Sequence, residues 1–242
     1  MNGFITLITG ASSGMGLATS KEFLSLGATV IGVALDFDNM EEDLGDKFIP
    51  ITANLTDPEK ITEICNFVKE KYGILDTLFC NAGRSDGKEV DQVDLEHYEA
   101  LTGVMLRAPV LLTKGFAELL QKSPHASIIH TCSIASYALG KGPTYRIAKT
   151  GLNNFTRNSA MFFGGKVRVN SICPGVIRTG IVDAAGWDAY EKIAVPVLPS
   201  RRLGQAWEIA KLAAFLASDE SKSINGASIL IDGGWITTHP KA

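Results

Sequence analysis

The stretch FITLITGASSGMG, residues 4–16, combines a short apolar run with three glycines. The apolar run is rich in β-branched residues and predicts a strand. Gly10, Gly14 and Gly16 follow it, and apolar residues then recur at intervals of three and four over 15–26, which predicts a helix. Glycine lets the backbone turn sharply and approach a ligand, while the free N–H groups of the helix attract negative charge. The stretch therefore predicts a strand, a phosphate-binding turn and a helix, with an ordinary tight turn as the alternative.

Strand and helix patterns continue to alternate along the chain. Short apolar runs rich in β-branched residues are separated by longer segments of helical period, the pattern of a parallel sheet covered by helices on both faces. The seven predicted strands are residues 4–9, 28–35, 48–53, 76–81, 127–132, 167–172 and 227–232. The predicted helices are residues 15–26, 58–72, 94–122, 144–163 and 205–217. We therefore expect an α/β fold with a seven-stranded parallel sheet.

Two stretches depart from the alternation. Residues 36–47 are too short and too acidic to hold a full helix between the second and third strands. Residues 180–200 contain Gly186, Pro196 and Pro199 and form a long connection, of the kind that often caps a site. We expect this segment, at about 180–200, to be a substrate lid.

Length and composition favour one compact domain over residues 1–242. With 242 residues, 45% of them apolar, the chain can bury a single large core. A formal net charge of −3, with no basic run longer than Arg201-Arg202, argues against nucleic acid and membrane surfaces as partners. The start of the chain lacks the pattern of a signal peptide, and no apolar run could span a membrane. We expect a cytoplasmic protein.

The cysteines do not suggest a metal site. Cys65, Cys80, Cys132 and Cys173 lie far apart in apolar surroundings, and no Cys/His spacing suits zinc. Buried, reduced thiols are therefore predicted.

An acidic residue follows the second strand pattern at an informative distance. A glycine turn between a strand and a helix, followed by an acid about twenty residues later, is typical of dinucleotide-binding units. Asp36 stands twenty residues after Gly16, and no Arg or Lys occurs in the ten positions after it. Its carboxylate can accept hydrogen bonds from ribose hydroxyls and would repel a 2′-phosphate. We therefore predict NAD rather than NADP, with a solvated loop aspartate as the alternative.

Six motifs now stand in order along the chain. They are TGASSGMG (9–16), NAG (Asn81–Gly83), Ser133, YRIAK (Tyr145 to Lys149), PGVIRT (Pro174–Thr179) and DGG (Asp232–Gly234). In this order and spacing they resemble the short-chain dehydrogenase/reductase family over essentially the whole length. The resemblance implies a Rossmann-type, doubly wound single domain, with the nicotinamide near Ser133, Tyr145 and Lys149.

The resemblance also implies a set of cofactor-binding residues. Besides Tyr145 and Lys149, these are Gly10, Ser12, Ser13, Gly14, Met15, Gly16, Asp36, Asn54, Leu55, Asn81, Ala82, Gly83, Pro174, Gly175, Val176, Ile177 and Thr179. Asn54 stands where the family usually has an aspartate that touches adenine. An amide can still donate and accept hydrogen bonds there.

Tyr145 and Lys149 are four residues apart, so they share one face of a helix. That spacing alone would suit any surface pair. Ser133 ends the fifth strand pattern twelve residues earlier, at the edge where open α/β sheets bind ligands. A phenol can carry the proton in alcohol–ketone interconversion if nearby positive charge favours the phenolate. We therefore predict that Tyr145 is the acid/base, Lys149 the tuning cation and Ser133 the group that holds the substrate oxygen.

One position departs from the family pattern. The family usually has an asparagine in the helix before the fifth strand, where it helps to hold a proton-relay water. Met105 falls at that position, and residues 82–152 contain no asparagine. A thioether is a poor hydrogen-bonding substitute, but a main-chain carbonyl at a kink near Gly103 could hold the water. We predict a modified relay with retained activity, and impaired catalysis is the alternative.

The histidines are rival proton carriers. His97, His125 and His239 have polar sequence neighbours, which predicts exposure. His130 lies within a strand pattern and is expected to be a core or backbone-bonded residue.

The lid sequence suggests the substrate class. Its apolar residues are Ile181, Val182, Trp187, Tyr190, Val195 and Val197. We predict a small to medium apolar alcohol or ketone, with a cyclic terpenoid or steroid-like compound as the best guess. Alternatively, these residues simply pack the lid onto the domain. The resemblance further implies a homotetramer built through residues 94–122, residues 144–163 and the C-terminal strand.

Three other functions remain open. A 3-oxoacyl-carrier-protein reductase would share the catalytic residues but usually prefers NADP. A halohydrin lyase of related fold would have arginine in place of Lys149. A non-catalytic dinucleotide sensor is suggested only by Met105.

Overall fold

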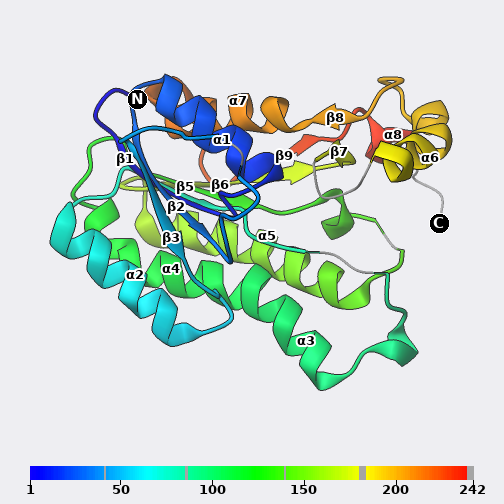
Figure 1. Ribbon diagram of the computed structural model, residues 1–242, viewed down its shortest axis with the longest axis horizontal. Helices are drawn as coiled ribbons and strands as arrows, with labels where there is room; N and C mark the ends of the chain where they lie inside the picture. The colour runs from blue at the N-terminus through cyan, green and yellow to red at the C-terminus, as the bar shows by residue number, and fades with distance from the viewer. Residues whose placement is uncertain (41, 85–86, 139, 180–183, 239–242) are drawn as a thin grey trace.

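Seven parallel strands form the central sheet of the computed structural model, which describes the chain except residues 41, 85–86, 139, 180–183 and 239–242 (Figure 1). The strands are β1 Ile5–Thr9, β2 Thr29–Ala34, β3 Phe48–Thr52, β4 Thr77–Cys80, β5 Ser127–Thr131, β6 Arg168–Pro174 and β9 Ser228–Ile231. Their spatial order is β3-β2-β1-β4-β5-β6-β9, and every neighbouring pair is parallel. The predicted α/β, Rossmann-type, doubly wound sheet is confirmed.

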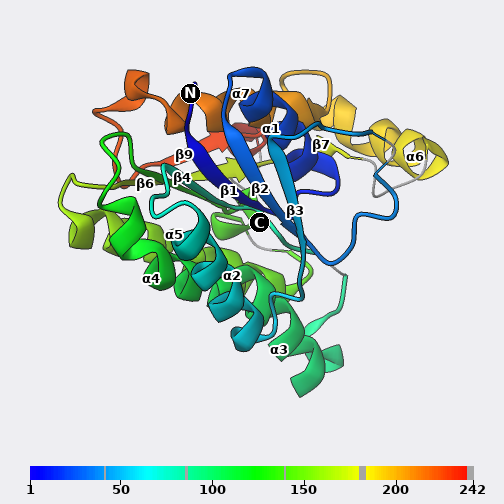
Figure 2. The same ribbon diagram turned by 60° about the vertical axis from the view of Figure 1, so that its left-hand side comes forward.

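Helices cover both faces of this sheet (Figures 1 and 2). One face carries α1 (Gly14–Ser25) and α7 (Ala206–Ala217); the other carries α2 (Pro58–Lys71), α4 (Ala108–Leu120) and α5 (Pro143–Phe163). The shorter elements are α3 (Leu95–Thr102), α6 (Ala184–Ala194) and α8 (Trp235–Thr238), with single turns at Val90–Gln92, Ile134–Ser136, Val195–Val197 and Asp219–Ser221. None of the helices described is long and apolar enough to cross a membrane.

The strands are apolar on both faces because each face has its own core. Leu7 and Leu78 belong to the core on the α2, α4 and α5 side, whereas the next residues, Ile8 and Phe79, belong to the core on the α1 and α7 side. Successive side chains of a strand point to opposite faces. The near-continuous apolar runs of the sequence are the consequence.

The strand order reverses at β1, which lies between β2 and β4. Thr9 fixes the carboxyl ends of β1 and β4 beside each other: its Oγ1 accepts hydrogen bonds from the Asn81 and Ala82 N–H groups, at 2.9 and 3.0 Å. The Asn81 Nδ2 atom donates to the Thr9 carbonyl at 3.1 Å. Open α/β sheets bind ligands at this kind of reversal.

The single helix predicted for residues 94–122 is divided in three. Between α3 and α4 lies a π-helical turn, Gly103–Arg107, in which the Ala108 N–H bonds the Gly103 carbonyl five residues back. Pro109 has no N–H to give to the Met105 carbonyl, so a regular α-helical ladder cannot continue past this point. The kink expected near Gly103 is present, and its cause includes Pro109.

The predicted lid segment contains a helix that the sequence analysis did not identify. Helix α6 occupies Ala184–Ala194, where Ala, Glu and Lys are good helix formers, and it ends just before Pro196. A second, two-stranded sheet pairs β7 (Ile177–Arg178) with β8 (Gly204–Gln205) beside it. The described residues of 36–47 contain no helix, as predicted.

Candidate active site

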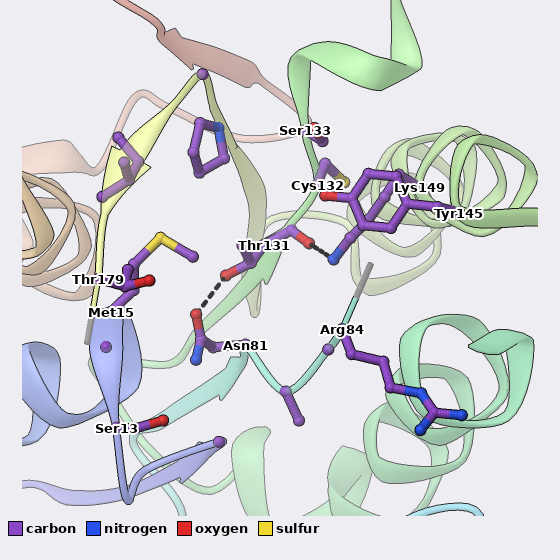
Figure 3. A pocket seen from close by; sticks show the side chains of 17 residues that line it. Ser13, Met15, Asn81, Arg84, Thr131, Cys132, Ser133, Tyr145, Lys149 and Thr179 are labelled. Atoms are coloured by element: carbon purple, nitrogen blue, oxygen red, sulfur yellow. Dashed lines mark hydrogen bonds between the residues drawn. The ribbon is translucent and has the colours of Figure 1, made fainter. Parts of the chain in front are cut away.

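A cavity of about 340 Å³ opens at the carboxyl ends of the strands (Figure 3). The predicted site residues that line it are Gly10, Ser13, Gly14, Met15, Asn81, Ala82, Gly83, Ser133, Tyr145, Lys149, Pro174, Gly175, Ile177 and Thr179. Ser133, Tyr145 and Lys149 lie on one side of it, opposite Met15 and Thr179. The fold thus brings together residues separated by more than a hundred positions in the sequence.

Lys149 is held by the main chain of β5. Its side chain is only 3% exposed, and Nζ donates a hydrogen bond to the Thr131 carbonyl at 2.6 Å. The Nζ atom lies 5.7 Å from the centre of the Tyr145 ring, one helical turn away on α5. A buried ammonium with a fixed acceptor is a pre-positioned positive charge beside the phenol.

The hydrogen bonds of Lys149 continue toward the glycine turn. The Thr131 hydroxyl donates to Asn81 Oδ1 at 3.3 Å, and Asn81 is itself bonded to Thr9. Figure 3 shows the first two links of this series, from Lys149 to Thr131 and from Thr131 to Asn81. The side of the cavity that holds Lys149 and the glycine turn are therefore linked by one series of hydrogen bonds.

Ser133 is placed by the end of β5 and the short turn after it. Its side chain is buried at the cavity wall, and Oγ accepts a hydrogen bond from the Ala135 N–H at 3.1 Å. This bond uses the oxygen as an acceptor, so the hydroxyl hydrogen remains available to a substrate oxygen.

Arg146 supports the loop that follows Ser133. Its guanidinium donates to the carbonyls of Ala135, Ala138 and Lys141. Helix α5 therefore carries Tyr145 and Lys149 and also fixes the segment next to the serine.

The glycine turn fits a dinucleotide. A Cβ atom added to Gly16 would overlap the Gly10 carbonyl and lie 2.8 Å from Asn81 Nδ2, so only glycine allows this close backbone packing. Ser13, the N-cap of α1, makes no side-chain capping hydrogen bond. The first-turn N–H groups of α1 can therefore bind phosphate oxygens.

A second cavity, of about 410 Å³, adjoins the first at the glycine turn. Among the predicted residues, Ser12, Asp36, Asn54 and Leu55 line it, together with Gly10, Ala82 and Gly83. Asp36 is exposed just beyond β2. The Asn54 Oδ1 atom accepts hydrogen bonds from the Thr56 N–H and hydroxyl, which leaves its NH₂ group as the donor toward a ligand.

The segment after β6 forms the far wall of the first cavity. A Cβ atom on Gly175 would lie 2.7 Å from the Asp232 Cα atom, so glycine at this position lets the PGVIRT and DGG motifs lie in contact. Asp232 in turn accepts hydrogen bonds from the N–H groups of Gly234 and Ile236, both at 2.9 Å. Two predicted residues line neither cavity. Gly16 lies beneath the glycine turn, and Val176 packs against an apolar cluster of the lid segment that includes Trp187.

Part of the lid segment packs into an apolar cluster, whereas Ile193 and Val197 are exposed. Trp187, Ala194, Leu198 and Leu203 are buried in one cluster, which Val195 also contacts. None of these residues lines the first cavity. This packing matches the alternative in which the apolar lid residues serve folding. Ile181 and Val182 lie outside the described residues, as does the side chain of Tyr190.

Met105 is buried near Lys149. Its exposed fraction is 0%. A Cβ atom added to Gly83 would lie 3.2 Å from the Met105 Sδ atom and 3.7 Å from the Lys149 Nζ atom. The thioether therefore lies close to Gly83, near the ammonium, and the Met105 side chain packs with Leu101 and Ala148.

None of the three described histidines lines the first cavity. His130 is fully buried, its Nδ1 lies 2.9 Å from the Thr156 hydroxyl, and burial lowers its pKa to about 3. His125 is partly exposed and pairs with Asp219 at 3.0 Å. The exposure predicted for His97 is wrong, because the packing of α3 buries it. His239 lies outside the described residues.

The four cysteines are free thiols, as predicted. Cys80, Cys132 and Cys173 are buried and Cys65 is partly buried; burial raises the pKa of Cys65 to about 11. Among the described residues, no three His, Cys, Asp or Glu side chains lie close enough to hold a metal ion.

Besides the predicted residues, the first cavity is lined by Arg84, Thr131 and Cys132, and Thr9 supports it from β1. Thr9 and Thr131 act through a hydroxyl oxygen and a carbonyl oxygen, and neither occurs in a distinctive sequence pattern. Arg84 follows the NAG motif directly and lines both cavities. Its position next to the motif was the available signal.

The chain is similar to known proteins along nearly its whole length. The model of a family described as enoyl-(acyl carrier protein) reductase matches residues 10–236. The 3-oxoacyl-[acyl-carrier-protein] reductase FabG of Thermotoga maritima is 33% identical over 244 residues, which cover 98% of this chain and 99% of that protein.

Solved structures agree with this similarity. A short-chain type dehydrogenase/reductase from Mycobacterium marinum is 26% identical, with a TM-score of 0.88 over 97% of this chain and 96% of that one. The L-sorbose reductase of Gluconobacter frateurii, complexed with NADPH and L-sorbose, is also 26% identical, with a TM-score of 0.90 over 98% of both chains. The chain therefore belongs to the short-chain dehydrogenase/reductase family of oxidoreductases.

Proposed function

We propose that the protein interconverts a secondary alcohol and a ketone with NAD as cofactor and Tyr145 as the acid/base. The observation that carries this proposal is the anchored Lys149 ammonium, 5.7 Å from the Tyr145 ring, in a cavity that also contains Ser133. The dinucleotide would supply the hydride acceptor or donor.

Side chains of the protein would carry out the proton transfer and bind the substrate oxygen. In the reductive direction Tyr145 gives its hydroxyl proton to the carbonyl oxygen, and Ser133 donates a hydrogen bond to the same oxygen. Lys149 stabilises the phenolate that remains, because positive charge favours the ionised form. The oxidative direction runs these steps backwards. General acid–base catalysis of this kind contributes about 10²- to 10⁴-fold in rate.

The cofactor-binding residues proposed are those named from the sequence, with Gly16 acting through backbone packing. For the adenosine end we propose NAD, since the exposed Asp36 carboxylate lines the second cavity and would repel a 2′-phosphate. The NADPH bound by the similar L-sorbose reductase supports the other cofactor. Initial rates with NADH and NADPH on a panel of ketones test the choice.

We expect kcat/KM to be at least about tenfold higher with NADH than with NADPH, since unpaired charge repulsion of this kind costs roughly 1–2 kcal/mol. An Asp36→Ala variant should lose most of that preference. Equal use of both cofactors by the wild type would overturn the NAD assignment. NAD binding without turnover of any substrate would favour the dinucleotide sensor.

The substrate proposed is a small to medium apolar alcohol or ketone, with a cyclic terpenoid or steroid-like compound as one class. A second candidate is a 3-oxoacyl-carrier-protein reductase, supported by the name of the Thermotoga relative. Parallel rates with cyclic ketones and with a 3-oxoacyl thioester separate the two. A preference for the thioester by more than tenfold in kcat/KM would favour the second.

We also propose a homotetramer. On the outer face of α5, Met161 and Phe162 are 76% and 78% exposed, and an apolar groove lies between α4 and α5. Large exposed apolar groups on one face are typical of association surfaces. Light scattering should give a tetramer for the wild type and smaller species for Phe162→Glu; a wild-type monomer would contradict the proposal. The cytoplasmic location stays a prediction.

A further inference from the structure

The charge of the catalytic cavity is one-sided. Among its described lining residues, Arg84 and Lys149 are the charged ones, and both are cations. A cavity lined by one sign of charge favours ligands of the opposite sign.

The two cations differ in what they already bind. Lys149 is buried and bonded to the Thr131 carbonyl. Arg84 is exposed and has no hydrogen bond or ion pair with any residue that the structure describes. Around the same groove, Arg107 donates to the Thr56 carbonyl and Arg178 pairs with Glu191. Arg84 is therefore the guanidinium of the described groove that remains available to a ligand.

The direction of Arg84 separates it from the reacting centre. In Figure 3 its guanidinium points away from Ser133, Tyr145 and Lys149. It also lines the second cavity, together with Ala100 of α3 and Val104 of the π-helical turn. A group bound to the Arg84 guanidinium would thus lie at the edge of the cavities, beside the residues proposed to bind the dinucleotide and away from the substrate oxygen.

We propose that Arg84 binds an oxyanion, a carboxylate or a phosphate, carried by the substrate several bonds from its carbonyl carbon. A guanidinium binds such groups through two parallel N–H bonds. The inference rests on the proposed function and deepens it by adding a charged group to the substrate. The apolar part of the substrate would lie near Ser133, Tyr145 and Lys149. The diphosphate of the dinucleotide is the less suitable occupant: the uncapped N-terminus of α1, at Ser13, lies across the cavity from Arg84.

The test compares ligands that differ only in charge. Methyl-ketone carboxylates with two, four or six methylene groups between the ketone and the acid are paired with their methyl esters. Methyl-ketone alkyl phosphates with the same spacers are paired with their dimethyl phosphate esters, which covers phosphate as the oxyanion. Their dissociation constants are measured by calorimetry on NAD-saturated protein, which cannot reduce the ketone, so the result does not depend on turnover.

Wild-type protein should bind at least one charged ligand about tenfold or more tightly than its neutral partner, as hydrogen bonds to charged groups allow. Arg84→Gln should abolish the difference, and Arg84→Lys should keep part of it. Arg157→Gln removes the same charge from an exposed site on α5 and should change nothing. The pair that shows the difference identifies the oxyanion as carboxylate or phosphate.

Equal binding of charged and neutral ligands by the wild type would overturn the proposal, as would discrimination that survives in Arg84→Gln. A tenfold loss of NAD affinity in Arg84→Gln would assign the guanidinium to the cofactor instead. Failure of the wild type to reduce any ketone counts against the proposed function, and the binding comparison still decides the role of Arg84.

Discussion

The glycine turn shows at the scale of single residues how the backbone makes room for a ligand. Gly16 lies so close to the Gly10 carbonyl and Asn81 that a methyl group has no space. The turn, β1 and β4 are connected there, since Asn81 also bonds Thr9. A change at Gly16 should therefore alter cofactor binding as well as folding.

Gly16→Ala should weaken NAD binding by at least about tenfold, because relief of the overlap shifts the turn that would bind the cofactor, and the same overpacking should lower the free energy of unfolding by roughly 1–3 kcal/mol. Fluorescence titration with NADH measures it. Gly87→Ala is the matched control, since a Cβ atom at Gly87 meets nothing within 4 Å. NADH affinity that is the same in Gly16→Ala and in wild type would contradict the structure of the turn.

The sequence predicted most of the residues that line the two cavities, because glycines, an acid and a spaced tyrosine–lysine pair each impose a recognisable chemistry. It could not predict the hydrogen-bond acceptors that hold these side chains, such as the Thr131 carbonyl that binds Lys149. Any residue supplies a carbonyl, so Thr131 had no distinguishing signal, and the role proposed for Arg84 depends on its having no partner among the residues that the structure describes.

At the scale of elements, the π-helical turn Gly103–Arg107 places Met105 beside Lys149. The sequence suggested a kink near Gly103. It did not suggest a π-helical turn, because the change from α-helical to π-helical hydrogen bonds depends on which main-chain carbonyl loses its N–H donor. Pro109 removes the donor of the Met105 carbonyl. Helix α6 was missed for a related reason: Gly186 and two prolines in the segment outweighed its helix-forming residues. Strands as short as β7 and β8 have no periodicity to detect.

Met105→Asn tests the modified relay. Burying an amide at this fully buried position should lower the free energy of unfolding by about 1–3 kcal/mol, and the turnover number should stay within about tenfold of wild type. Met105→Leu, which keeps an apolar side chain of similar size, is the control and should match wild type. If wild type is inert on every ketone and Met105→Asn is active, the missing asparagine has impaired catalysis.

For the whole molecule, the fold was predictable from the pattern of apolar residues. Strands between two apolar cores carry short apolar runs, and the helices that cover them carry apolar residues at intervals of three and four. Assembly and substrate were less predictable. Of the apolar lid residues that suggested an apolar substrate, Trp187 and Val195 pack in a cluster that does not line the first cavity, and a sequence alone does not show which apolar surface stays open.

Stability should depend on pH through His130. Its pKa is about 3 in the folded protein and near 6.5 when unfolded, so between these values the unfolded chain binds the extra proton. The stabilisation is present above about pH 6.5 and is lost as the pH falls toward 3. Urea unfolding should show that the loss between pH 7 and pH 5 is about 2 kcal/mol smaller in His130→Gln than in wild type. Equal losses would show that His130 titrates normally in the fold.

The proton transfer by Tyr145 is tested most directly by single-turnover oxidation of bound NADH in wild type and Tyr145→Phe. The variant removes one hydroxyl and keeps the ring, Lys149 and the glycine turn. NADH affinity should stay within about threefold, while the rate of hydride transfer to a ketone should fall at least about 100-fold. A variant that oxidises NADH with a ketone nearly as fast as wild type would contradict the role assigned to Tyr145.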